Sequence, residues 1–506
     1  MRSTCLAVCL VLLAAGAIAA ARQGSTVAFV GATVIDGTGV APIVDGVVVV
    51  DEGRIRAVGA QGAVSIPSGT QVVDAKGRWI VPGFIDTNVH LSLYGGVNER
   101  YETLVRYADR QRDIVLEAAQ LQLLHGVTTV RDSYGLLEPL VAVRDEIAAG
   151  RALGPRILAA GNIVGWGGPY SVSFSLIPER GLTLFQEQMN DAVSQDAGEE
   201  LTHLPLDELR RAIRAYLDKG PDFLKYGGTA HFARPSFIGF SPEAQRVIVD
   251  ETHRRERLAE THATTPEGLR LSIEAGIDLI QHPEVLSDRE LPDPIVRAIV
   301  ERGIICSMLT NTMTGETWTK HLKDKGEAEK KRAADKAKMV TNRALTTAEQ
   351  RQRDADLGVG LDIRRQNAKK LIEAGAIVTV GTDNYWAAAA ELSRTPKLEN
   401  QSHGIGTIIG IEGLVELGMT PLQALVAATA NGARASKMAD IGTIASGQRA
   451  DLLLLAADPL TDIRNIRQLV TVMKDGRIID RDRLPERRVL SPTPTAAPST
   501  SGRPGG

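Results

Sequence analysis

The sequence of 506 residues predicts an α/β fold, a (β/α)8 TIM barrel with a small β-sandwich domain built from both chain ends. Three observations lead to this prediction. Short β-branched runs crowd the two ends, helical stretches alternate with such runs in the middle, and a glycine stands at several junctions between them. The alternative, a doubly wound open sheet, is less favoured because no glycine-rich nucleotide motif is present.

Charge and composition limit the kinds of partner. Lys and Arg total 58 and Asp and Glu total 61, which gives a formal net charge of −3. This balance disfavours nucleic acid, because phosphate binding needs a concentrated basic surface. Apolar residues make up 43% and charged residues 24%, as in ordinary globular proteins. We therefore expect a small-molecule substrate, and the oligomeric state stays open.

Residues 1–21 have the order of a secretory signal peptide, with a basic residue, an apolar run and small residues at its end. A membrane anchor is the alternative, but the run lies at the lower limit of a bilayer span. We expect a secreted or periplasmic protein with no membrane attachment after cleavage. Cleavage also removes Cys5 and Cys9, so the remaining Cys306 can form no internal disulfide.

The two ends of the chain share one character. Short β-branched runs separated by turn residues fill residues 26–80, and similar runs return in residues 439–482. We expect these two segments to form the β-sandwich together. Residues 491–506 consist almost entirely of Ser, Thr, Pro, Ala and Gly, which predicts a disordered tail.

Residues 81–438 are expected to form the barrel. An insertion at residues 316–356 is dense in charge and predicted to be helical, and its interleaved acidic residues favour a solvated helix over a nucleic-acid patch. Glycines 126, 276, 303 and 375 stand where a helical stretch gives way to a β-branched run. Eight apolar runs predict the parallel strands: 84–91, 127–131, 156–160, 222–226, 258–262, 278–282, 304–308 and 377–383.

Polar side chains stand at the carboxyl ends of five of these strands, where barrel enzymes place their active sites. Each alone could be a capped surface histidine or a lysine that reaches to solvent. Together, imidazoles and a carboxylate are ligands for zinc-like ions. A lysine fits among cation ligands only when carboxylated to a carbamate. The candidates are Asn88, His90, Lys225, His262, His282 and Asp383.

The motifs around these residues resemble the metal-dependent amidohydrolase superfamily, in order and over roughly residues 27–480. They are VPGFIDTNVH at 81–90, GVTTVRD at 126–132, DFLK at 222–225, THA at 261–263, IQHP at 280–283, GTD at 381–383 and GQRADL at 447–452. By this resemblance His90 binds a first metal, and His262 and His282 bind a second metal. Carboxylated Lys225 bridges the two metals. Asp383 is then both a ligand and the proton carrier.

One motif departs from the family pattern. The first strand of the superfamily usually carries His-x-His, and this chain has Asn88-Val89-His90. It resembles a subgroup with Asn-x-His that includes phenylurea hydrolases, in which hydrolysis is retained. An amide oxygen is a poorer donor than imidazole for zinc. We therefore expect weaker metal binding at the first position. The number of bound ions, one or two, and their identity, Zn²⁺ or another divalent metal, stay open.

The sequence predicts a metal-dependent hydrolase of a C–N bond in an amide, urea or dipeptide-like substrate. The metal activates water, and Asp383 takes the water proton and gives it to the leaving amine. Tyr94, Tyr226 and His231 follow metal-bearing strands closely and are predicted substrate contacts, with loop packing as the alternative. The rival functions are a lactone or phosphoester hydrolase and a non-catalytic binding protein. The presence of Lys225 together with Asp383 opposes the second rival.

Processing provides the first testable prediction. Because the apolar run is short and closes with small residues, the exported protein should begin near Ala20 or Arg22. Intact-mass measurement of exported protein checks this, with protein retained in the cytosol as the unprocessed control. Exported protein that retains Met1 would contradict the prediction.

Overall fold

The computed structural model describes residues 26–92, 106–175, 181–231, 236–286, 289–338, 346, 359–385 and 399–491. The predicted signal peptide and all of the predicted tail after Ser491 lie outside these ranges. The chain divides into two compact units. The first comprises Met1–Phe84, Thr420–Arg434 and Met438–Asp480, and the second comprises Ile85–Met419, Ala435–Lys437 and Arg481–Gly506. Residues 420–434 thus belong to the first unit, although the predicted boundary lay after residue 438.

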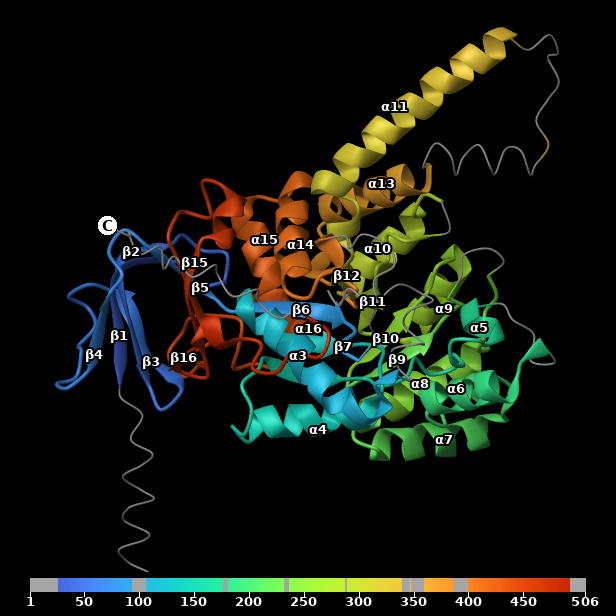
Figure 1. Ribbon diagram of the computed structural model, residues 1–506, viewed down its shortest axis with the longest axis horizontal. Helices are drawn as coiled ribbons and strands as arrows, with labels where there is room; N and C mark the ends of the chain where they lie inside the picture. Colours follow the sequence, from blue (N-terminus) through green and yellow to red (C-terminus); the bar gives the residue numbers. More distant parts are fainter. Residues whose placement is uncertain are drawn as a thin grey trace, which may run out of the picture. The chain divides into compact units, whose positions relative to one another are not determined.

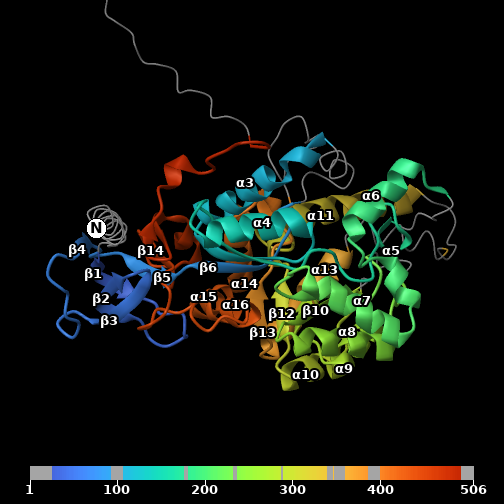
Figure 2. The same cartoon turned by 90° about the horizontal axis from the view of Figure 1, so that it is seen from below.

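The first unit is built on one eight-stranded sheet to which both ends of the chain contribute (Figure 2). The sheet order is β16-β15-β14-β5-β1-β2-β3, and β4 pairs in parallel with β1. The two ends of the chain meet where β5 pairs antiparallel with β14. The hydrogen bonds give one continuous sheet, and the predicted sandwich stays a prediction. The strands are β1 (Val27–Val34), β2 (Ile43–Asp51), β3 (Arg54–Ala60), β4 (Gln71–Asp74), β5 (Trp79–Pro82), β14 (Leu452–Leu455), β15 (Leu469–Lys474) and β16 (Arg477–Ile478).

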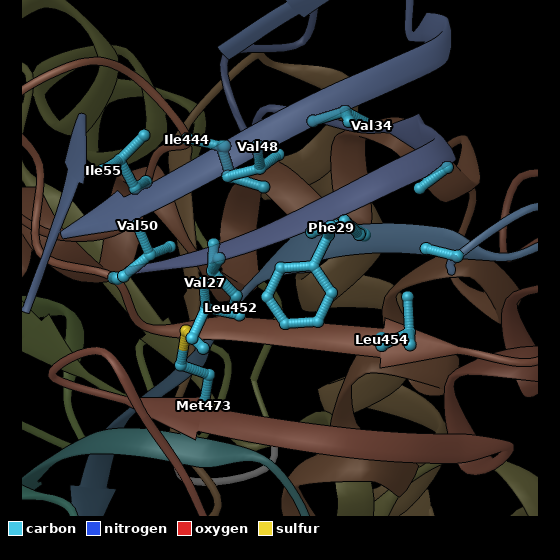
Figure 3. Packing of buried hydrophobic residues seen from close by; sticks show 14 residues of the cluster. Val27, Phe29, Val34, Val48, Val50, Ile55, Ile444, Leu452, Leu454 and Met473 are labelled. Carbon is cyan, nitrogen blue, oxygen red and sulfur yellow. The ribbon is translucent and has the colours of Figure 1, made fainter. Parts of the chain in front are cut away.

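A shared hydrophobic cluster holds the strands of the two chain ends together (Figure 3). Phe29 of β1 and Val48 of β2 belong to the same cluster as Leu452 of β14 and Met473 of β15. Val47 belongs to a second cluster, because neighbouring residues of a strand point to opposite faces of the sheet. Both faces of β2 are therefore covered, which explains its unbroken run of valines.

Eight strands form the frame of the second unit, and each overlaps a segment predicted from the sequence, with β7 and β9 running one residue beyond the predicted end. Strands β13-β12-β11-β10-β9 form one parallel sheet, and β6-β7-β8 form another. Strands β7 and β8 are also parallel. The strands are β6 (Phe84–Val89), β7 (Val127–Asp132), β8 (Arg156–Ala159), β9 (Leu224–Gly227), β10 (Ala259–His262), β11 (Leu279–Gln281), β12 (Ile305–Met308) and β13 (Ile377–Val380).

Single β-bridges join the edges of these two sheets. Val164, which follows β8, pairs in parallel with Tyr226 of β9. Val89 of β6 pairs in parallel with Asn384, which follows β13. The α/β content and the parallel sheets are therefore consistent with a TIM barrel.

Helices alternate with the strands of the second unit (Figure 1). In the described part of the chain, no helix is long and apolar enough to cross a bilayer. The helices of the second unit are α3 (Gln111–Leu124), α4 (Leu137–Ala148), α5 (Val172–Ser175), α6 (Leu184–Ser194), α7 (Leu206–Asp218), α8 (Pro242–Arg254), α9 (Pro266–Ala275), α10 (Asp293–Glu301), α11 (Gly315–Lys338), α13 (Val359–Glu373) and α14 (Ile405–Glu416). Helix α15 (Pro421–Ala428) lies in the first unit, and α16 (Ala430–Ala435) begins there.

Glycines in a left-handed conformation lie at the junctions where the sequence predicted them. Gly276 caps α9 with φ 93°, and Gly126, Gly303 and Gly375 have φ of 84°, 63° and 76°. Side chains with a Cβ rarely adopt such φ values, so glycine lets the chain turn directly from a helix into the next strand. These predicted αβ junctions are confirmed.

The predicted insertion is helical where it is described. Helix α11 extends to Lys338, and the next described helix, α13, begins at Val359. His321 and Lys325 of α11 both pair with Asp362 of α13. The part of the insertion between the two helices, apart from Thr346, lies outside the described residues.

A buried ion pair joins the two parallel sheets. Arg131 of β7 donates to Glu260 of β10 over 2.6 Å, and neither side chain is more than 1% exposed. Gln281 of β11 donates to the other oxygen of this carboxylate over 3.0 Å. A buried charge is tolerated only when it is paired and hydrogen-bonded. The pair therefore fixes β7 relative to β10 and β11.

Replacing one partner of this pair tests how much the pair contributes to the stability of the fold. Glu260→Gln leaves the Arg131 charge buried without a counter-ion, and we expect a destabilisation of about 3–5 kcal/mol. The thermal midpoint, followed by circular dichroism, should fall clearly. Glu267→Gln is the matched control, because its exposed pair with Arg270 should contribute less than about 1 kcal/mol. Equal midpoints for the two variants would contradict the prediction.

Candidate active site

The candidate residues meet at one cavity of about 220 Å³ in the second unit. Five of the six predicted side chains line it, and Asn88, the sixth, lies behind them against Asp383. The carboxyl ends of parallel strands meet at one end of such a frame, which is why residues far apart in sequence converge. The five are His90 after β6, Lys225 of β9, His262 at the end of β10, His282 after β11 and Asp383 after β13.

Two of these residues have unusual backbone conformations. His282 has φ 38° and Asp383 has φ 55°, in the left-handed region that residues with a Cβ rarely adopt. His282 directly follows β11, and Asp383 lies three residues after the end of β13. Strained residues of this kind cluster at functional sites, because the surrounding structure must hold them in place.

His90 and Asp383 form the first pair of donors. Nε2 of His90 lies 2.6 Å from Oδ1 of Asp383, and Nδ1 lies 3.0 Å from the carbonyl oxygen of Tyr134. Burial would raise the pKa of Asp383, but the charge and hydrogen bond of His90 outweigh it and hold this pKa well below its usual range. Asp383 is therefore ionised, and half-buried beside the cavity.

His262 and His282 form the second pair. Nδ1 of His262 lies 3.2 Å from Nε2 of His282, and the rings meet edge to face. Burial lowers the pKa of His282 to about 3 and holds that of His262 well below its usual value. Both imidazoles are therefore neutral, which is the state in which histidine binds metals.

Lys225 is the buried amine of the site. Its side chain lies beside Glu260, its neighbour across the strand pair, and its Nζ donates to Ser133 Oγ over 3.2 Å. Burial lowers the pKa of Lys225, although the nearby carboxylates of Glu260, Asp383 and Asp132 oppose this shift. The Lys225 amine is therefore more easily neutral in this buried environment than it would be in water.

The donors form two pairs rather than one cluster. Within the described ranges, no three side chains of His, Cys, Asp or Glu are grouped as a metal site. Lysine and asparagine, which the sequence also proposed as ligands, are not among these four residue types. The arrangement consists of two close donor pairs with Lys225 facing the same cavity.

Asn88 does not present its oxygen to the cavity. Its amide oxygen accepts a hydrogen bond from Ser133 Oγ, and its Nδ2 lies 3.3 Å from Oδ1 of Asp383. The predicted role as an oxygen ligand needs the opposite orientation of the amide. The structure thus places Asn88 beside the donors but turns its only metal-binding atom away.

The three predicted substrate contacts have different positions. His231 lines the cavity and stacks on Phe174 with ring centroids 4.4 Å apart. Tyr226 is adjacent to Lys225 on β9, so its side chain points the other way, and its buried hydroxyl donates to Gln245 over 3.1 Å. The structure therefore does not bring Tyr226 to the cavity. Tyr94 lies outside the described residues.

The structure adds a largely aromatic wall that sequence reasoning missed. Tyr134 follows β7, and Ile163 and Trp166 follow β8, while Phe174 comes from α5. The Trp166 ring meets His262 edge to face at 4.6 Å. Tyr385, two residues after Asp383, completes the wall. A position shortly after a strand end was the only available signal.

Comparisons with known proteins agree with this geometry. Residues 79–479 match the sequence profile of the amidohydrolase family. The crystal structure of phenylurea hydrolase B is 31% identical with a TM-score of 0.80, covering 93% of this chain and all of that one. Molinate hydrolase is 30% identical with a TM-score of 0.79, covering 94% and 99% of the two chains. Ochratoxinase from Aspergillus niger is 23% identical over 79% of this chain and 75% of its own. The chain therefore belongs to the amidohydrolase family and is a hydrolase of carbon–nitrogen bonds, as the resemblance of its motifs implied.

Proposed function

We propose that this protein hydrolyses the C–N bond of a small amide, urea or dipeptide-like substrate with the help of bound Zn²⁺ or a similar divalent ion. The observation that carries the proposal is the cavity in which two donor pairs and a buried lysine face an aromatic wall. Such a site can bind an ion at one side and the organic part of a substrate at the other.

The donor set fits a metal ion. The 3.2 Å between the ring nitrogens of His262 and His282 resembles the roughly 3.3 Å that separates two ligands of a tetrahedral zinc ion. His90, Lys225 and Asp383 complete the proposed ligand set.

Lys225 would bind metal as a carbamate. A neutral amine attacks the carbon of CO₂ through its nitrogen lone pair and loses one proton to solvent, which leaves an anionic carbamate. Burial favours the neutral amine that this reaction needs. The two carbamate oxygens replace a repelling ammonium with anionic donors.

The chain's own residues move the proton. A bound divalent ion supplies a Lewis acid and lowers the pKa of water. Asp383 accepts a proton from the water that attacks the carbonyl carbon, and it returns this proton to the nitrogen as the C–N bond breaks. The rings of Tyr134 and Phe174 stack with centroids 5.9 Å apart, and they form part of the apolar side of the cavity.

We further propose the finer architecture and the location of the protein. The bridges at Val164 and Val89 support a closed (β/α)8 barrel. The cluster shared by Phe29 and Leu452 supports two sheet halves that pack as a sandwich. The composition of residues 1–21 supports export to the periplasm or the medium.

A substrate panel with and without metal tests the proposed function. Amides, ureas, dipeptides, lactones and phosphoesters are offered to the purified protein. We expect turnover of at least one C–N substrate, its loss on chelation and its return with Zn²⁺, because the ion activates the attacking water. Turnover of lactones or phosphoesters alone would favour those rival reactions. Protein that binds no metal and hydrolyses nothing would favour a binding protein.

Asp383→Asn tests the proton carrier. The amide keeps the size of the side chain but cannot accept the proton, so kcat should fall on the order of 10²-fold or more. Asp196→Asn is the matched control, since that side chain is 91% exposed and pairs with Lys219 at the surface. Near-normal turnover of Asp383→Asn on the best substrate would show that the role belongs to another residue.

A further inference from the structure

A chain of hydrogen bonds connects the buried amine to the carboxylate of the site. Nζ of Lys225 donates to Ser133 Oγ over 3.2 Å, and Ser133 Oγ donates to the amide oxygen of Asn88. Nδ2 of Asn88 then donates to Oδ1 of Asp383 over 3.3 Å. Ser133, Asn88 and Lys225 are almost completely buried. Ser133 has no role in the function argued so far.

The direction of this chain follows from the chemistry of its ends. Nζ of Lys225 is the donor in its bond to Ser133, so Ser133 Oγ accepts at this end of the chain. The single hydroxyl proton of Ser133 is then left for Asn88, whose oxygen accepts it. Carboxylation of Lys225 leaves one N–H on Nζ, which preserves the direction. The amide N–H of Asn88 consequently faces Asp383, which only accepts when ionised.

The backbone leaves the amide of Asn88 as the one adjustable group. The Asn88 N–H donates to Asp86 Oδ1 over 3.1 Å, and the Asn88 carbonyl accepts from the Asp383 N–H over 2.8 Å. These bonds fix the main chain of Asn88 and Asp383 relative to each other. The side-chain amide of Asn88 could still turn either its nitrogen or its oxygen toward Asp383. Ser133 contacts the amide oxygen, on the side away from Asp383.

We propose that Ser133 is a positioning residue for Asp383 and that it acts through Asn88. By holding the amide oxygen, it keeps the amide N–H on Oδ1 of Asp383, the same oxygen that His90 contacts. Oδ2 of Asp383 accepts no hydrogen bond from any described residue, which leaves this oxygen for the proton transfer. Asn88 is thus a hydrogen-bond donor to the proton carrier instead of a weak metal ligand. This inference rests on the proposed function.

A double-mutant cycle tests the proposal on the best substrate of the panel. Ser133→Ala should lower kcat about tenfold or more, because slight misplacement of a reacting group is costly, while KM and bound metal stay unchanged. Asn88→Ala should have a similar effect with the same metal content. The double variant should be no slower than Asn88→Ala, since the two residues act as one unit. Ser272→Ala is the control, a buried serine whose hydroxyl bonds Gln245 outside the site.

Other outcomes would overturn it. Metal loss in Asn88→Ala, measured after dialysis, would make Asn88 a ligand, and additive losses in the double variant would make the two residues independent. A thermal midpoint that falls far below that of Ser272→Ala, with kcat unchanged, would leave Ser133 a packing role only.

A crystal structure of Ser133→Ala gives a result that needs no turnover. We expect the contact between Asn88 Nδ2 and Asp383 Oδ1 to be lost or reversed. An unchanged contact overturns the proposal even if the wild-type protein hydrolyses nothing on the panel. Failure of the proposed function, seen as an inactive wild type, is thereby separated from failure of the role of Ser133.

Discussion

The contact between β6 and the segment after β13 is the constraint on which the site depends. It joins Asn88 to Asp383, which are 295 positions apart in sequence. The carboxylate of Asp86 stabilises this junction. It accepts hydrogen bonds from the Asn88 N–H, from Thr382 Oγ1 over 2.6 Å and from Thr407 Oγ1 over 2.7 Å. Burial raises the pKa of Asp86 to about 6 in spite of these bonds. Without this junction His90 would have no carboxylate beside it.

Burial decides the electrostatics of the site. The same low-dielectric interior keeps His262 and His282 neutral, lowers the pKa of Lys225 and raises that of Asp132 to about 8. Asp132 accepts from the N–H groups of Leu91 and Tyr134, and so fixes the Tyr134 carbonyl that contacts His90. Such groups cost stability unless hydrogen bonds or ion pairs satisfy them, as the pair of Arg131 and Glu260 does for its own two charges.

The cavity combines a polar and an apolar half that come from different parts of the sequence. The polar half stands on or just after strands, where backbone pairing sets each position. Much of the apolar half, including Trp166 and Phe174, comes from the segments that follow β8. The Trp166 Nε1–H donates to the carbonyl of Thr229 over 2.9 Å.

The sequence by itself predicted the eight strands, the αβ-junction glycines and six candidate site residues, five of which line the cavity. It could do so because strand periodicity and left-handed glycines are local properties, and a strand end fixes which side of the frame a residue reaches. Only the tertiary structure decided what Asn88 and Tyr226 contact, which residues wall the cavity, and that Ser133 links Lys225 to Asn88. Those contacts depend on the direction of each hydrogen bond and on which side chains from distant segments pack in one buried volume. The spacing of residues along the sequence specifies neither of these.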